Sequence, residues 1–185
     1  MDRTLGCGWR ATLGWPIMAG ILFQGKLRAQ GPDIGPPPGK LVDVGGYRLH
    51  LDCRGSASPT VVIDVGAGAW SIFFTHIQEE IAAEARVCTY DRAGMGWSDP
   101  SPLPRTRERM VQELHALLRR SDVPAPYVLV GHSLGGLNVR AFATQHPDEV
   151  AGVVLVESAH EDQWSRLPPE AFAALRKSLS RLPLR

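Results

Sequence analysis

The residues with the clearest chemical potential form the segment Gly131–Gly135, with the sequence GHSLG. Its central residue, Ser133, carries a hydroxyl that becomes a nucleophile when a base removes its proton. The G-x-S-x-G spacing is typical of a tight turn that holds a serine at the end of a strand. Glycine is needed at both flanking positions because larger side chains there would clash. The segment therefore predicts a strained turn that presents a serine for acyl transfer.

The elements that must position Ser133 are visible on both sides of it. Residues 127–130, YVLV, have the pattern of a strand, and residues 134–146 have helical spacing that ends before Pro147. A helix that begins just after the serine directs its first N–H groups at the site, where negative charge develops.

The rest of the chain alternates between strand and helix patterns. We expect further strands at 41–44, 47–53, 60–65, 86–90 and 151–157, and further helices at 70–85, 106–120 and 168–182. The first two strands flank Gly45-Gly46, a hairpin signal. The alternation predicts an α/β fold with a mainly parallel sheet and helices on both faces.

Two of the expected helices carry apolar residues at helical spacing. In 106–120 the inward residues are expected to be Met110, Val111, Leu114, Leu117 and Leu118. In 70–85 the residues at helical spacing are Ile72, Phe73, His76, Ile77 and Ile81.

Over residues 40–165 the chain resembles the α/β-hydrolase family. The resemblance rests on the serine turn and on three further stretches: VGAGAW at 65–70, YDRAGMGWSD at 90–99 and VVLVESAHEDQ at 153–163. They stand where the family has its oxyanion loop, its D-x-x-G-x-G-x-S stretch and its sixth strand. The family's usual histidine before the oxyanion-loop glycine is replaced here by valine.

The resemblance implies a role for individual residues. Ser133 corresponds to the nucleophile, and the backbone N–H groups of Leu134 and Ala67 correspond to the oxyanion donors, with the N–H of Gly68 as the alternative to that of Ala67. Gly131 and Gly135 are the turn glycines. The implied substrate is a small-molecule carboxylic ester or related acyl compound, and no cofactor is implied. A serine in place of an aspartate at the turn argues against dehalogenase and epoxide hydrolase chemistry.

The acid and the histidine of the family's triad have no obvious counterparts in this sequence. Glu157, at the end of the sixth strand, is a candidate acid, and His160 is a candidate base. His146 stands at the far end of the helix after Ser133, about 20 Å away at 1.5 Å per residue, and is out of reach. We therefore expect the chain to be an N-terminal part of a longer hydrolase, truncated after the sixth strand; the alternative is a non-catalytic, hydrolase-like binding module.

The length, the net charge and the N-terminal segment limit the possible domain organisation, partners and location of the protein. The 185 residues suit one domain, and a net charge of +1 gives no basic footprint for nucleic acid. Residues 1–29 resemble a signal peptide, with a short membrane anchor as the alternative, so we expect an exported, periplasmic or extracellular protein. Residues 30–39 form a Pro/Gly linker, and 166–185 begin a cap or a C-terminal helix. The sequence leaves the oligomeric state open.

The cysteines and histidines give one further expectation each. In the family's sheet order the fourth strand lies beside the second, so the resemblance implies that Cys53 and Cys88 are neighbours. They are candidates for a disulfide, with two buried free thiols as the alternative. No CxxC or HxxxH spacing is present, so we expect no metal site.

Overall fold

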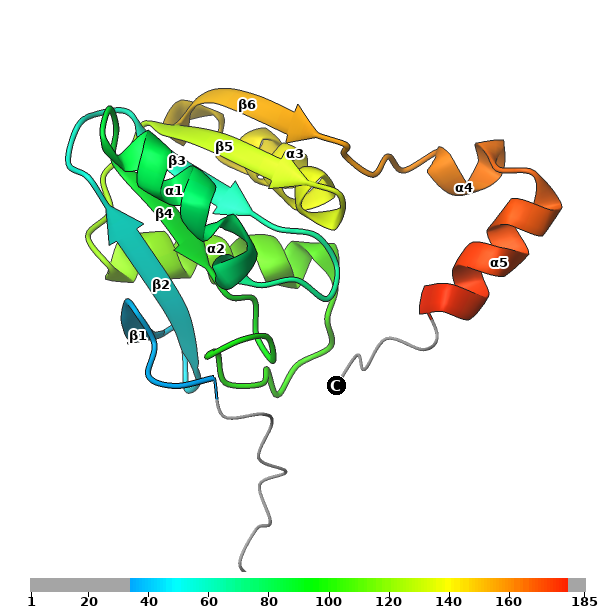
Figure 1. Cartoon of the computed structure of the whole chain (residues 1–185), viewed down its shortest axis with the longest axis horizontal. Helices are drawn as coiled ribbons and strands as arrows, with labels where there is room; N and C mark the ends of the chain where they lie inside the picture. Colours follow the sequence, from blue (N-terminus) through cyan, green and yellow to red (C-terminus); the bar gives the residue numbers. More distant parts are fainter. Residues whose placement is uncertain (1–33, 180–185) are drawn as a thin grey trace, which may run out of the picture. The chain divides into compact units, whose positions relative to one another are not determined.

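The structure is a computed structural model that describes residues 34–179; the expected export segment, 1–29, lies outside the described residues. Figure 1 shows a central sheet with helices against it. The strands are β1 (Lys40–Asp43), β2 (Arg48–Arg54), β3 (Thr60–Asp64), β4 (Val87–Tyr90), β5 (Tyr127–His132) and β6 (Val150–Val156). The helices are α1 (Thr75–Ala82), α2 (Arg107–Arg120), α3 (Leu134–Gln145), α4 (Gln163–Arg166) and α5 (Pro169–Leu179), with short 3-10 helices η1 (Ser71–Phe74) and η2 (Pro147–Glu149). None of the described helices has the length and apolarity that crossing a membrane requires.

The six strands form one sheet in the order β1-β2-β4-β3-β5-β6. The pairs β1/β2 and β2/β4 are antiparallel, and the pairs β4/β3, β3/β5 and β5/β6 are parallel. The predicted fold class, a mainly parallel α/β sheet, is confirmed. Because parallel strands end at the same edge, the loops that follow β3, β4, β5 and β6 meet there, and these loops carry the candidate site residues.

Alternation along the buried strands divides the core between the two faces of the sheet. Ile63, Val65 and Val87 pack with residues of η1 and α1 on one face. Val62 and Cys88, each one position away, belong to the larger cluster that includes residues of α2 and α3 on the other face. Figure 1 shows α1 on one side of the sheet and α2 and α3 together on the opposite side. Helices therefore cover both faces, as predicted.

The two predicted helix faces differ in outcome. Four of the five residues expected to point inward from α2 are buried: Val111, Leu114, Leu117 and Leu118. In the segment 70–85, by contrast, Ile72, Phe73 and Ile77 are 51%, 63% and 48% exposed, while Gln78 is buried. The segment begins as a 3-10 helix, whose tighter winding shifts the phase of the side chains. Gln78 is satisfied inside because its Nε2 donates to Asp52 O at 2.9 Å and its Oε1 accepts from Thr89 Oγ1 at 3.2 Å.

Strand β6 carries an exposed apolar row. Val153, Val154, Leu155 and Val156 are 38%, 47%, 48% and 42% exposed. In the described part of the chain β6 pairs with β5 alone. An apolar strand at a sheet edge is an aggregation hazard unless another element covers it.

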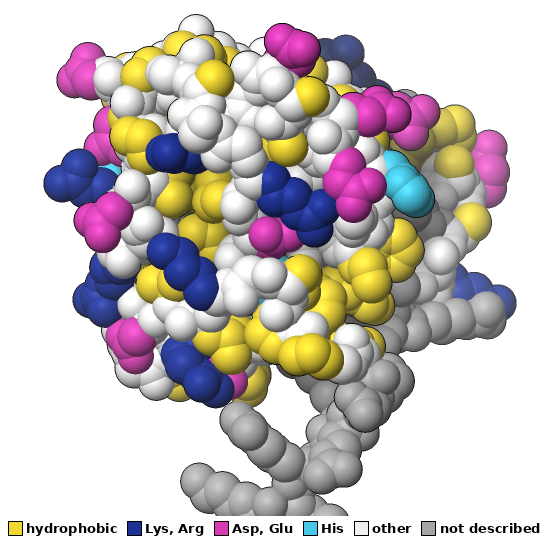
Figure 2. Space-filling model, turned by 60° about the vertical axis from the view of Figure 1, so that its left-hand side comes forward, with side chains coloured by type: hydrophobic (Ala, Val, Ile, Leu, Met, Phe, Trp, Pro, Cys, Tyr) yellow, Lys and Arg dark blue, Asp and Glu magenta, His cyan; other side chains and the backbone are white. Residues whose placement is uncertain are grey.

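Charges on the surface are mixed rather than segregated. On the face in Figure 2, Lys and Arg side chains alternate with Asp and Glu, and apolar side chains lie between them. This distribution agrees with the nearly neutral net charge of +1.

Candidate active site

Ser133 lies between β5 and α3 in a backbone conformation that side-chain-bearing residues rarely adopt (φ 52°, ψ −117°). Its N–H donates to Val156 O at 3.2 Å, and its carbonyl accepts from the N–H groups of Gly136 and Ala159, both at 3.0 Å. Strain of this kind persists only where the surroundings enforce it. Here the first turn of α3 and the residues around the end of β6 hold the backbone on both sides of the serine.

The turn glycines leave no room for a side chain. A methyl group at Gly131 would lie 2.6 Å from Gly136 Cα, and one at Gly135 would lie 2.0 Å from Asp64 O. Both obstacles are backbone, which cannot rotate away as a flexible side chain can. The close approach of α3 to β3 and β5 therefore depends on these glycines.

We expect Gly135→Ala to lower the free energy of unfolding by more than about 3 kcal/mol, because the added methyl must push α3 away from β3. The matched control is Gly152→Ala in β6, where a methyl group meets nothing within 4 Å. Urea unfolding of both variants checks this. Equal stabilities of the two variants would contradict the steric explanation.

The loop after β3 also packs close to Ser133. A methyl group at Gly66 would lie 3.3 Å from Ser133 Cβ. Arg92 Nη1 donates to Val65 O at 2.5 Å, and Arg92 Nη2 donates to Gly66 O. Because a trans peptide directs its C=O and N–H in opposite directions, the Ala67 N–H points away from Arg92. In the described part of the chain neither this N–H nor that of Leu134 donates to a backbone carbonyl.

A buried polar network anchors Arg92 beneath this loop. The Asp64 carboxylate, fully buried at the end of β3, accepts from Arg92 Nη1 at 2.5 Å and from Tyr90 Oη and Asn138 Nδ2, both at 2.9 Å. Burial and the Asp64 charge raise the pKa of Tyr90 well above its usual value, which keeps the phenol protonated as a donor. Burial lowers the pKa of Arg92, but the favourable interactions with Asp64, Tyr90 and Asp91 together outweigh burial, so the pKa is raised overall. From the sequence, Asp91 and Arg92 are expected to tie the loop after β4 to the sheet, but Asp64 and Asn138 are not identified as partners of this network; the signal for Asp64 is an acidic residue that ends an otherwise apolar strand.

The loop after β4 is held by a second buried carboxylate, Asp91. Its Oδ1 accepts from Ser71 N–H at 2.8 Å, and its Oδ2 accepts from Trp97 N–H at 3.0 Å. His50 Nδ1 lies 3.0 Å from the same Oδ2, while His50 Nε2 accepts from Gly39 N–H. A neutral His50 therefore carries its proton on Nδ1, facing Asp91. Burial raises the pKa of Asp91, but the hydrogen bonds from His50, Ser71 and Trp97 outweigh burial, so the pKa is lowered overall.

This lowered pKa predicts acid sensitivity. A carboxyl group whose pKa is lower in the folded chain adds stability above its unfolded pKa, about 3.9, and this stability is lost as pH falls through the folded value. We expect Asp91→Asn to be about 1–3 kcal/mol less stable at pH 7 and to lose less stability than the parent chain between pH 5 and pH 2. Thermal unfolding across this range, with the exposed Asp148→Asn as control, measures the difference. Parallel pH curves for the parent chain and Asp91→Asn would refute the assignment.

The structure does not join the two remaining candidates to Ser133. Glu157 follows β6 with φ 43°, and its side chain is exposed. His160 is 55% exposed at its side chain, and its Nδ1 accepts from Asp162 N–H at 3.1 Å. Among the described residues no hydrogen bond connects Ser133, Glu157 and His160. His132 directly precedes Ser133 in the chain. Its Nδ1 lies 3.1 Å from the position that a methyl group on Gly66 would occupy. This Nδ1 is buried and has no hydrogen-bond partner in the described part of the chain.

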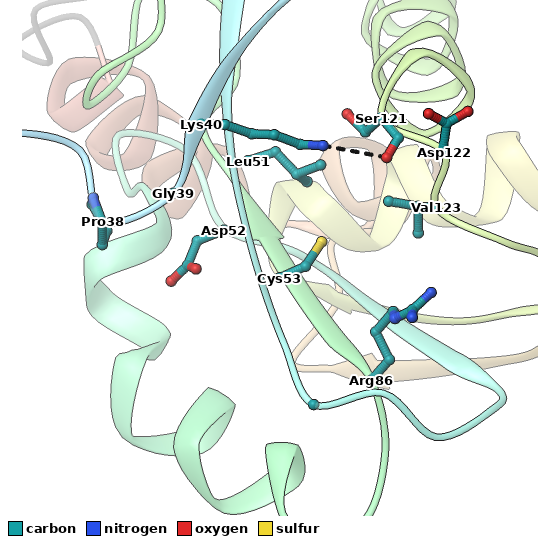
Figure 3. A pocket seen from close by; sticks show the side chains of 11 residues that line it. Pro38, Gly39, Lys40, Leu51, Asp52, Cys53, Arg86, Ser121, Asp122 and Val123 are labelled. Carbon is teal, nitrogen blue, oxygen red and sulfur yellow. Dashed lines mark hydrogen bonds between the residues drawn. The ribbon is translucent and has the colours of Figure 1, made fainter.

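A disulfide and a pocket lie away from the serine turn. Cys53 and Cys88 stand opposite each other in the antiparallel β2/β4 pair and are joined by a disulfide, with Cα atoms 4.1 Å apart. Figure 3 shows Cys53 in the wall of a pocket between β2 and the residues that precede β4 and β5, where Lys40 Nζ donates to Ser121 O at 3.3 Å. Because these residues precede the parallel strands, the pocket lies at the amino ends of those strands, whereas Ser133 lies at their carboxyl ends.

Comparison with known proteins agrees with the fold. A family model for the alpha/beta hydrolase fold matches residues 59–183. The chain is 31% identical over 139 residues to a pimeloyl-[acyl-carrier protein] methyl ester esterase of Shewanella sp., covering 71% of the chain and 49% of the esterase. It is 35% identical over 129 residues to an AB hydrolase superfamily protein of Gibberella zeae, covering 65% of the chain and 40% of that protein. The structure of a thermophilic esterase from Thermogutta terrifontis matches with a TM-score of 0.63 and 26% identity, covering 77% of the chain and 52% of the esterase.

These matches cover most of this chain and only part of each relative. The chain spans half or less of the length of the curated relatives it matches, from 20% to 49%. The match of the family model over 59–183, together with the strand order and the serine turn, shows that the chain belongs to the α/β-hydrolase family.

Proposed function

We propose that this chain carries the nucleophile and the oxyanion donors of a serine hydrolase that acts on carboxylic esters or related acyl compounds. The observation that carries the proposal is the strained backbone conformation of Ser133, with φ 52°, between β5 and α3. The loop that contains Gly66 packs closely against this serine. The esterases among its relatives, from Shewanella and Thermogutta terrifontis, support an ester as the substrate.

In the proposed reaction Ser133 Oγ attacks the acyl carbonyl while a base accepts the hydroxyl proton. The tetrahedral oxyanion that forms is bound by the N–H groups of Ala67 and Leu134. The alcohol leaves with that proton, and water then releases the carboxylic acid from the acyl-serine in the same way. Each of the two donors stabilises the transition state, and the loss of one typically costs about 2.7–4 kcal/mol of that stabilisation.

We propose that the base comes from outside the described residues. The support is that no described histidine is hydrogen-bonded to Ser133, and that the chain spans about half the length of the Shewanella esterase. A reading frame that continues past Arg185 into a strand, an acidic residue and a later histidine would agree with this source.

The test is covalent labelling of the 185-residue chain by a fluorophosphonate probe, followed by mass spectrometry. We expect a slow adduct on Ser133, none on Ser133→Ala, and unchanged labelling of the control Ser178→Ala. Turnover of a p-nitrophenyl ester should stay far below the ordinary rate of about 10 s⁻¹, with residual catalysis of about 10³–10⁴ over water. Equal labelling of Ser133→Ala would reject the nucleophile, and ordinary turnover would reject the missing base.

A second candidate, a non-catalytic hydrolase-like binding module, is favoured by one observation: His160 makes its contacts with Glu161 and Asp162 rather than with Ser133. The two candidates differ in the probe experiment, because a binding module leaves Ser133 unlabelled even at long times.

We also propose that the protein works in an oxidising compartment outside the cytosol. The disulfide between Cys53 and Cys88 supports this location, since such bonds persist where thiols are not kept reduced.

A further inference from the structure

Three potential metal ligands meet at the end of α3 that is remote from Ser133. His115 comes from α2, His146 follows α3 and Glu149 belongs to η2. One possible ligand atom from each residue lies within 4.8 Å of the other two. The sequence conceals this grouping because His115 is more than thirty positions from Glu149, and only the packing of α2 beside α3 brings them together.

Two contacts define how the three side chains lie. His115 Nε2 lies 3.1 Å from Glu149 Oε1, and the rings of His115 and His146 stack with centroids 3.9 Å apart. Metal–ligand bonds of about 2.0–2.2 Å place neighbouring donor atoms about 3.4 Å apart in a tetrahedral site. The first pair already has nearly this separation, and the His146 ring needs to rotate to complete the set.

The surroundings of the cluster suit a bound cation. Glu149 Oε2 is buried and has no hydrogen-bond partner in the described part of the chain. A buried carboxylate oxygen without a partner is rare and costs free energy. Phe142 packs against both imidazoles, with centroids 5.8 Å from His115 and 4.8 Å from His146, and forms an apolar wall. The backbone of the loop is fixed, since His146 N–H donates to Phe142 O and Glu149 N–H donates to His146 O.

We propose that His115, His146 and Glu149 form a site for a divalent transition-metal ion of the Zn²⁺ class. Two imidazoles and a carboxylate are a donor set that such ions accept, with water in the fourth position. The ion would replace the contact between His115 Nε2 and Glu149 Oε1, satisfy the buried oxygen and link α2 to α3 and η2. The site lies about 20 Å from Ser133 along α3, so it is independent of the proposed hydrolase function.

The test is calorimetric titration of the full chain, without a histidine tag, with Zn²⁺ after treatment with a chelator. We expect one ion per chain, and a rise in Tm of about 5 °C or more at a hundredfold excess over Kd. His146→Gln and Glu149→Gln should each weaken binding at least about tenfold. The matched control His76→Gln removes an exposed histidine that also lies near a carboxylate, Glu79, and should bind as the parent chain does.

Each outcome decides the proposal. No binding by the parent chain, or equal affinity in Glu149→Gln, would overturn it. A loss of affinity in His76→Gln as large as in His146→Gln would assign the binding to scattered surface groups instead. Glu149→Gln keeps the shape of the side chain, so it should fold even if His146→Gln does not; its metal-free Tm, close to that of the parent, verifies this.

Discussion

Replacing Arg92 by methionine should lower the free energy of unfolding by about 3–5 kcal/mol, because it leaves the Asp64 carboxylate buried without its charged partner. Asp64 is fully buried, and Arg92 Nη1 contacts its Oδ1 at 2.5 Å. The same change frees the carbonyls of Val65 and Gly66. If the Ala67 N–H binds the oxyanion, labelling of Ser133 by the fluorophosphonate should also slow, by up to about 10²–10³-fold.

Two comparisons separate the buried ion pair from a general effect of losing an arginine. Arg176→Met, on the exposed surface of α5, should stay within about 0.5 kcal/mol of the parent. The double variant Asp64→Asn/Arg92→Met should be more stable than Arg92→Met alone, because it removes the stranded charge. Urea unfolding measures all of these variants. An Arg92→Met chain as stable as Arg176→Met would show that Asp64 does not depend on Arg92.

Reduction of the Cys53–Cys88 bond should cost about 3–4 kcal/mol of stability, or about 6–16 °C in Tm. The bond closes a sequence separation of 35 residues, which restricts the unfolded chain. Cys53 is exposed at the pocket in Figure 3, so a reductant can reach it. Thermal unfolding with and without reductant measures the effect.

The control is Cys53→Ser, whose Tm should already be low and should not change when reductant is added. Thiol counting gives an independent check. The sequence has three cysteines, so the denatured chain without reductant should show one reactive thiol, that of Cys7, if the bond is present. Three reactive thiols would contradict the disulfide.

The mainly parallel α/β fold class was predictable because it depends on local patterns. Apolar runs such as residues 60–64 and 127–130 need burial on both faces, and the helical patterns between them leave few ways to connect them other than a parallel sheet. The glycines at 131 and 135 were equally informative, because only a close backbone approach requires them at that spacing. The exposed face of η1 and α1 was not predictable, since a 3-10 start changes the phase and Gln78 finds buried partners from distant strands.

Sequence by itself determined the fold class, the strained serine turn and the helix that follows it, because these depend on residues that are adjacent along the chain. Only the tertiary structure decided what surrounds that turn. Arg92 reaches Asp64 and the loop after β3 because β4 pairs with β3, and His115 reaches Glu149 because α2 packs beside α3. Partners of this kind are set by contacts between segments far apart in sequence, which no local pattern of residue types records.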